Sequence, residues 1–137
     1  MSEAIPADAK YISLRTFKKD GTAVDTPVWF AVLGEGAERK LIVFTDGTSY
    51  KVKRLRRDPR VEVTLCNARG DIFADAWQKG RGRIIEGPAE ATYIARGYAA
   101  LNAKYGMLMR VGTFFSTLAG RVRRRLILEL TLDAPSV

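Results

Sequence analysis

Residues 45–57 have the sequence TDGTSYKVKRLRR, which joins the end of a predicted strand to the start of a predicted helix. Leu41–Thr45 predicts the strand, and Ser49 is suited to accept a hydrogen bond from the free N–H groups of the first helical turn. Asp58-Pro59 should end the helix, because proline disfavours the helical conformation in the residue before it. We therefore expect a strand, a tight turn and a short helix over 49–57.

The start of this helix carries positive charge. Lys51 lies in its first turn, and Lys53 and Arg54 follow directly. The helix macrodipole already places partial positive charge there, so lysine is unfavourable unless an anion binds. Free N–H groups, a cap hydroxyl and cations together suit a phosphate, which predicts a site for a nucleotide-like cofactor. The alternative is a solvated helix face.

A proline within the preceding predicted strand, Val24–Leu33, marks a second feature. Pro27 lacks a ladder donor and confines the strand to a sheet edge or a bulge. An edge leaves backbone groups free to bond a flat polar ring, with Trp29 or Phe30 as an apolar wall. The alternative is that both aromatic side chains fill the core.

Short strands dominate the rest of the chain, with a hairpin turn at the Asp20-Gly21 pair. Within 24–33, Val28, Phe30 and Val32 are predicted to lie on one face, opposite Trp29, Ala31 and Leu33. In the last strand, Leu126, Leu128, Leu130 and Leu132 share one face. Six predicted strands with few helices indicate a small antiparallel β-barrel. The predicted strands are 11–17, 24–33, 41–45, 61–66, 72–86 (a bent strand or strand pair) and 126–132. Besides 49–57, helices are predicted from Pro88 to Gly106 and around Val111, Phe114, Phe115 and Leu118. The apolar stripe of the helix from Pro88 to Gly106 is predicted to be Ala91, Ile94, Tyr98, Leu101 and Tyr105.

Composition narrows the chemistry. The 137 residues fit one domain, 1–137, and include a single cysteine and no histidine. This excludes Ser-His-Asp and Cys-His nucleophiles and zinc sites of histidine and several cysteines. Carboxylates do not cluster at metal-binding spacing, so no metal is expected and difficult chemistry would belong to an organic cofactor. Cys66 is predicted to be a small core residue, because no histidine activates it.

The net charge of +8 indicates an anionic partner: nucleic acid, an acidic membrane face or a phosphorylated small molecule. No run approaches the roughly 20 apolar residues that span a bilayer. The first ten residues lack an apolar signal core, and one cysteine suits a reducing compartment. We therefore expect a cytoplasmic protein that does not bind a membrane.

Several motifs together resemble a known family. YISLRTF (11–17), TPVWFA (26–31), SYKVKRLRRDPRV (49–61) and LNAKYG (101–106) are similar to flavin and deazaflavin oxidoreductases of the pyridoxamine 5′-phosphate oxidase-like split-barrel superfamily. LNAKYG and the arginine-rich run before the last strand also resemble a short, F420-dependent subfamily. The resemblance covers nearly the whole chain. It implies a mainly β fold with some α, a six-stranded antiparallel FMN-binding split barrel with flanking helices.

The resemblance also implies a homodimer with one cofactor, F420 or FMN, per subunit at the dimer interface. The backbone of the second strand would meet the ring, and a strand-end threonine, a serine and a lysine would hold the phosphate. The expected cofactor-binding residues are Val28, Trp29, Phe30, Thr45, Ser49 and Lys51, with Lys53 and Arg54 added from charge and helix position. No residue is assigned as catalytic; Tyr50 or water could donate a proton.

Two departures from the family bear on the substrate. Authentic pyridoxamine phosphate oxidases carry an arginine and a lysine where this chain has Pro27 and Val32, and their C-terminal Trp and Arg-Leu-Pro elements are missing. Vitamin B6 chemistry is therefore not expected. Arginine-rich surfaces suit the polyglutamate tail of F420, whereas FMN needs only the phosphate site. The cluster of Arg121, Arg123, Arg124 and Arg125 is either a ligand contact or a solvated run beside a hydrophobic strand.

The expected reaction is hydride transfer between the bound ring and a small-molecule acceptor. One alternative is a flavin or tetrapyrrole binder without turnover. Another is a basic barrel that binds nucleic acid, with an affinity that falls steeply with salt. Nucleic acid is not expected, because the cations gather at a helix start and before the last strand and are not interleaved with exposed aromatic side chains.

Overall fold

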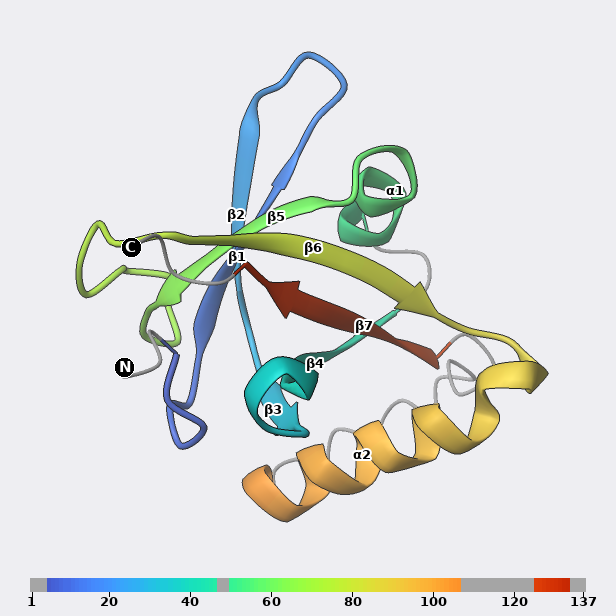
Figure 1. Cartoon of the computed structure of the whole chain (residues 1–137). Coiled ribbons are helices and arrows are strands. Elements are labelled where there is room, and N and C mark those ends of the chain that lie inside the picture. Colours follow the sequence, from blue (N-terminus) through green and yellow to red (C-terminus); the bar gives the residue numbers. More distant parts are fainter. Residues whose placement is uncertain (1–4, 47–49, 107–124, 134–137) are drawn as a thin grey trace.

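The computed structural model describes residues 5–46, 50–106 and 125–133. Within them the chain forms seven strands, two α-helices and two short 3₁₀ helices (Figure 1). The strands are β1 (Ile12–Phe17), β2 (Ala23–Val28), β3 (Phe30–Leu33), β4 (Lys40–Asp46), β5 (Arg60–Leu65), β6 (Gln78–Ile85) and β7 (Arg125–Leu132). The helices are α1 (Tyr50–Arg57), α2 (Ala91–Tyr105), η1 (Gly36–Glu38) and η2 (Pro88–Glu90).

The strands form one antiparallel sheet in the order β2-β1-β5-β6-β7-β4-β3. Its two edges, β2 and β3, are consecutive in the chain and separated only by Trp29. The sheet therefore curls until its edges meet at one residue, which produces a split barrel. The single strand predicted over 24–33 is consequently two strands, and the barrel has seven strands instead of six. Pro27 lies in an edge strand, as predicted.

Other boundaries also differ from those predicted. Only Gln78–Ile85 of the segment 72–86 is a strand, and Ile72 makes a single bridge to Cys66. The segment before it is a loop, and the Thr64 hydroxyl lies 3.0 Å from the carbonyl oxygen of Ala76 and 3.3 Å from that of Ala74, either of which can accept its proton. Pro88 begins a 3₁₀ turn that precedes α2. The predicted cap at Ser49, the predicted helix around 111–118 and the arginines at 121–124 lie outside the described residues.

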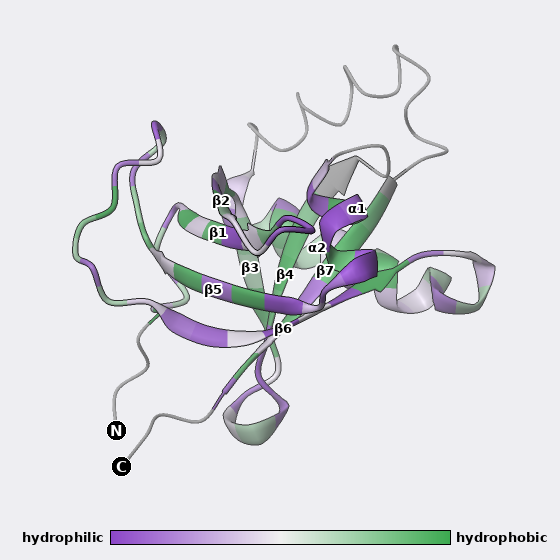
Figure 2. Ribbon diagram, turned by 90° about the horizontal axis from the view of Figure 1, so that it is seen from above, coloured by the Kyte–Doolittle hydropathy of each residue, from purple (hydrophilic) through white to green (hydrophobic). Residues whose placement is uncertain are grey.

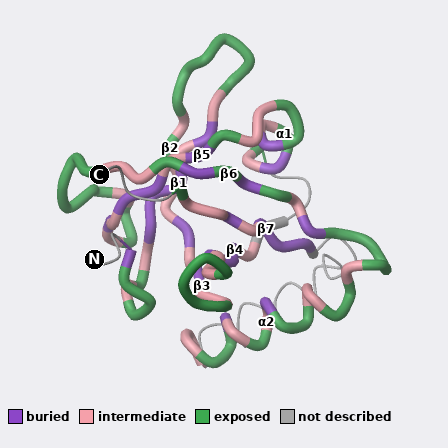
Figure 3. The backbone as a smooth tube through the Cα atoms, viewed as in Figure 1, coloured by how far each residue is buried: buried purple, intermediate pink, exposed green. Residues whose placement is uncertain are grey.

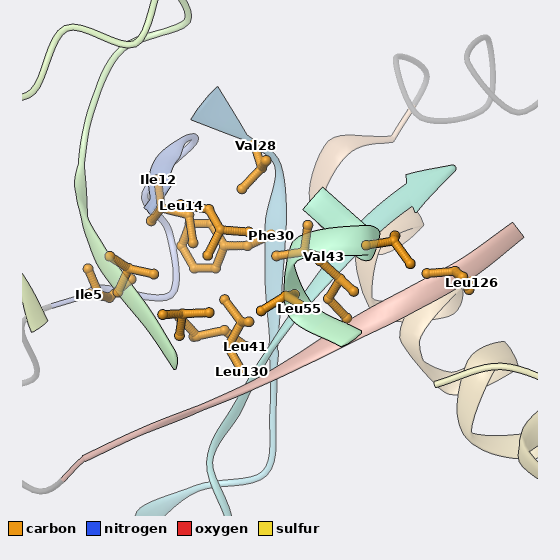
Figure 4. Packing of buried hydrophobic residues seen from close by; sticks show 14 residues of the cluster. Ile5, Ile12, Leu14, Val28, Phe30, Leu41, Val43, Leu55, Leu126 and Leu130 are labelled. Carbon is orange, nitrogen blue, oxygen red and sulfur yellow. The ribbon is translucent and has the colours of Figure 1, made fainter. Parts of the chain in front are cut away.

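Most of the core lies inside the curl. Figure 4 shows apolar side chains from β1 to β4, from β7 and from α1 converging on Phe30, which is fully buried. The predicted faces are confirmed: Val28, Phe30 and Val32 point inward, and so do the alternating leucines of β7. This inner core comprises Ile5, Ile12, Leu14, Val28, Phe30, Leu41, Val43, Val52, Leu55, Val61, Val63, Leu126, Leu128 and Leu130.

A second cluster lies between α2 and the outer face of β3, β4 and β7. It contains Ala31, Ile42 and Ile127, which alternate with inward-facing residues, so these strands are buried on both faces. Figure 2 accordingly shows β4 and β7 in hydrophobic colours and α1 in largely hydrophilic ones, and Figure 3 shows α2 alternating between exposed and partly buried residues. The predicted apolar stripe of α2 is confirmed by Ile94, Tyr98, Leu101 and Tyr105, although Ala91 is exposed.

Cys66 is confirmed as a core residue. It is 3% exposed and unpaired, and burial raises the pKa of its thiol. A protonated thiol in this position is a poor nucleophile.

Two glycines of β6 show how closely the strands and α1 pack. A Cβ on Gly80 would lie 2.5 Å from the carbonyl oxygen of Thr131, whereas one on Gly82 would lie 3.2 Å from a methyl group of Leu55. We expect Gly80→Ala to destabilise the fold by about 1–3 kcal/mol, because backbone has to move. Gly82→Ala should cost less, since the end of a leucine side chain can shift. Urea unfolding midpoints of both variants test this, and a larger loss for Gly82→Ala would contradict it.

Candidate cofactor site

The start of α1 is the part of the predicted phosphate site that the structure describes. The first turn holds no acidic residue. Lys51 is half-buried there, and exposed Lys53 places its Nζ atom 5.1 Å from the ring centroid of Tyr50, which is 72% exposed. The backbone of Thr45 lies in β4, one residue before that strand ends, and Ser49 precedes the helix outside the described residues. The predicted strand before this site and the predicted helix after it are therefore confirmed.

The arginines of α1 contact other parts of the chain. Arg54 donates from Nε to the buried hydroxyl of Thr16 at 2.6 Å, and Arg57 donates to the carbonyl oxygen of Phe17 at 3.0 Å. Arg56 forms an ion pair with Glu86 at 2.8 Å. Burial, together with the charge of Arg57, lowers the pKa of Arg54. The structure thus turns Arg54 toward β1, while Lys51 and Lys53 lie nearer the helix start.

This difference predicts opposite stability effects for two neighbouring cations. Arg54→Met should lower the free energy of unfolding by about 1.5–3 kcal/mol, because a charged hydrogen bond is lost and a buried hydroxyl is left without it. Lys53→Met, a matched change on the exposed side of the same helix, should stay within about 0.5 kcal/mol. Urea unfolding measures both, and equal midpoints for the two variants would show that Arg54 does not anchor α1.

The three residues expected to meet the cofactor ring lie where β2 becomes β3. The side chains of Val28 and Phe30 are buried in the inner core, so they fill the barrel and do not form an open wall. Trp29 points to the other side, where its ring stacks on that of Tyr105 with centroids 4.4 Å apart and planes 7° from parallel. Any ligand at this segment would therefore meet its backbone and the partly buried Trp29.

The backbone of Phe30 is held by the end of α2. Its N–H donates to the hydroxyl of Tyr105 at 3.0 Å, and its carbonyl oxygen accepts from Nζ of Lys104 at 2.9 Å. The Tyr105 hydroxyl also lies 2.7 Å from the carbonyl oxygen of Lys10. Sequence reasoning missed this cluster, because LNAKYG contributed to the family resemblance without indicating a contact with residue 30. A lysine and a tyrosine within an apolar helix stripe were the available signal.

Lys104 is only partly exposed to solvent. Its Nζ lies 3.5 Å from the ring centroid of Phe30 and 5.3 Å from that of Tyr105. Burial lowers the pKa of Lys104 to about 8, against an opposing effect of the Asp8 carboxylate. Burial also raises the pKa of Tyr105. Folding thus disfavours the ammonium form of Lys104.

This lowered pKa predicts a pH-dependent stability. Between about pH 8 and the pKa of about 10.4 for lysine in an unfolded chain, the unfolded state holds a proton that the folded state has released, so stability should rise with pH. The slope from one group is at most about 1.4 kcal/mol per pH unit. Urea unfolding of the wild type, compared with Lys104→Met at each pH, isolates this contribution. Parallel curves for the two proteins would contradict it.

The described residues also bear on metal binding and on membrane-spanning helices. No three Cys, Asp or Glu side chains among those residues gather closely enough to hold a metal ion. No helix described in the structure is long and apolar enough to cross a membrane.

The curled antiparallel sheet, with α1 contributing to its inner core and α2 on its outer face, defines a split β-barrel. The chain belongs to the pyridoxamine 5′-phosphate oxidase family, whose model matches residues 2–132. A comparison with curated proteins found no match.

Solved structures share the fold. A conserved hypothetical protein from Mycobacterium tuberculosis has a TM-score of 0.68 at 24% identity, over 98% of this chain and 82% of its own. The heme storage protein HutZ from Vibrio cholerae has a TM-score of 0.63 at 13% identity, over 92% and 83%. An F420 reductase has a TM-score of 0.56 at 20% identity, over 93% and 90%. At these identities the likeness concerns the fold alone.

Proposed function

We propose that this protein is an oxidoreductase that transfers a hydride between a bound F420 or FMN and a small-molecule acceptor. The observation that carries the proposal is the start of α1, where Lys51 and Lys53 follow the end of β4 and no acidic residue lies in the first turn. Family membership and a fold shared with an F420 reductase support it.

The chemistry of this helix start fits a phosphate. Peptide N–H groups at a helix start have no partner within the helix and attract an anion. Lys51 and Lys53 add positive charge in the same turn, and a phosphate would convert their unfavourable interaction with the macrodipole into a favourable one. Thr45 and Ser49 are the hydroxyl residues proposed to complete the site. The bound ring would supply the hydride chemistry, while the protein binds and orients it.

We also propose that the protein works as a homodimer in the cytoplasm, with residues 1–137 forming one domain and each cofactor lying between two subunits. Support comes from the family resemblance and from the inward direction of Val28 and Phe30. Because these side chains point into the barrel, they cannot enclose a cofactor ring bound outside it, and other residues would have to shield the ring from solvent. A second subunit would provide them. Sedimentation with and without FMN or F420 tests the assembly.

Lys51→Ala should weaken binding of the cofactor by about 1.5–3 kcal/mol, the scale of a hydrogen bond to a charged group. The matched control is Arg56→Ala, which removes one positive charge from the far end of the same helix, where Glu86 is its partner. Fluorescence titrations with FMN and with F420 measure both. Equal affinity in the wild type and Lys51→Ala would remove the phosphate anchor, and no binding of either compound would remove the proposed function.

A second candidate function is tetrapyrrole binding without turnover. It is favoured by the fold shared with a heme storage protein. Against it, the chain has no histidine to serve as the common axial ligand of heme iron. A titration with hemin, followed by its absorption spectrum, distinguishes the two candidates.

A further inference from the structure

The end of α2 carries two polar side chains that the proposed phosphate site does not use. Lys104 and Tyr105 both contact Phe30, which lies 74 and 75 positions earlier in the chain. Tyr105 also stacks on Trp29. These contacts fall on the segment expected to meet the cofactor ring.

The backbone at the β2–β3 junction requires hydrogen-bond partners, and this explains the position of Tyr105. Trp29 belongs to neither strand, and Phe30 begins an edge strand while its side chain is fully buried. Buried peptide groups at such a break require hydrogen-bond partners. The Tyr105 hydroxyl meets this need by accepting from the Phe30 N–H and donating to the Lys10 carbonyl oxygen, which joins β3, α2 and the segment before β1.

The stability of the fold does not explain why an ammonium group lies at Lys104. Its acceptor is a single carbonyl oxygen, and its other close neighbours are the rings of Phe30 and Tyr105. Desolvating an ammonium group opposes folding, and a longer apolar side chain would cover Phe30 without that cost. A charge that opposes folding, held against the expected ring-binding segment, indicates a functional role.

We propose that Lys104 and Tyr105 are positioning residues for the redox ring, holding the Trp29–Phe30 backbone and the Trp29 indole in the orientation that receives it. This inference rests on the proposed function. Tyr105 sets the plane of the indole through the stack and fixes the Phe30 N–H. Lys104 fixes the Phe30 carbonyl oxygen and keeps a positive charge beside the segment.

The test compares stability with ring binding in the full-length protein. Lys104→Met should unfold at an equal or higher urea concentration than the wild type, yet bind FMN about tenfold more weakly, which is about 1.4 kcal/mol. Lys19→Met, an exposed change in the β1–β2 turn with the same loss of charge, should alter neither quantity. A residue with a merely structural role would give the opposite pattern, with lower stability and unchanged affinity.

Riboflavin, which has the ring without the phosphate, separates the two ends of the site. Lys104→Met should weaken riboflavin and FMN by the same factor, whereas Lys51→Ala should weaken FMN alone. If F420 is the compound bound, the deazaflavin without its phosphate replaces riboflavin. Equal affinities of the wild type and Lys104→Met would overturn the positioning role. Failure of the wild type to bind any of these compounds would overturn the proposed function and this inference together.

Lys104→Arg provides a variant that keeps the charge. The groups that face Lys104 are Asp8 from the N-terminal segment and Tyr105 from α2, with Tyr11 beside Tyr105. Wild-type affinity should fall as the pH rises through about 8, because the ammonium loses its proton. Lys104→Arg should retain most of the affinity and show no such fall, and a fall identical to that of the wild type would overturn the role of Lys104.

Discussion

The barrel depends on one covalent constraint: the two edges of its sheet are the two halves of a single extended segment, joined through Trp29. Because β2 pairs with β1 and β3 pairs with β4, the strands between them have to curl back to the same residue. Because the chain passes directly from one sheet edge to the other at Trp29, the β-ladder hydrogen bonds are interrupted at this residue. The backbone of Phe30 then needs partners from outside the sheet, and α2 supplies them.

The two helices stabilise opposite sides of this sheet. Val52 and Leu55 of α1 enter the inner core, and Arg54 ties the helix to β1. The outer helix, α2, is fixed near both ends. Close to its start, the Tyr93 hydroxyl donates to Glu129, which also accepts from Arg83. The lysines at the start of α1 and Lys104 at the β2–β3 junction are positive charges for which the packing of these helices gives no reason.

The positively charged residues of α1 fall into two groups with different surroundings. The helix contains five lysines and arginines among eight residues. The arginines lie toward its end, where they reach a hydroxyl, a carbonyl oxygen and a carboxylate of other elements. The lysines lie near its start. Charge alone did not separate these groups, because the partners of the arginines lie in β1 and in the residue that follows β6.

The sequence by itself determined the period-two faces of β3 and β7, the edge position of Pro27 and the succession of a strand and a helix within residues 41–57. These follow from local rules: alternation, a missing donor and helix termination. Only the tertiary structure decided the break at Trp29, the turning of Arg54 onto Thr16 and the contact of Lys104 and Tyr105 with Phe30. Each of these joins residues 38 to 75 positions apart or depends on closure of the sheet. Local patterns carry no information about such contacts, because they arise only when the curled sheet brings distant segments together.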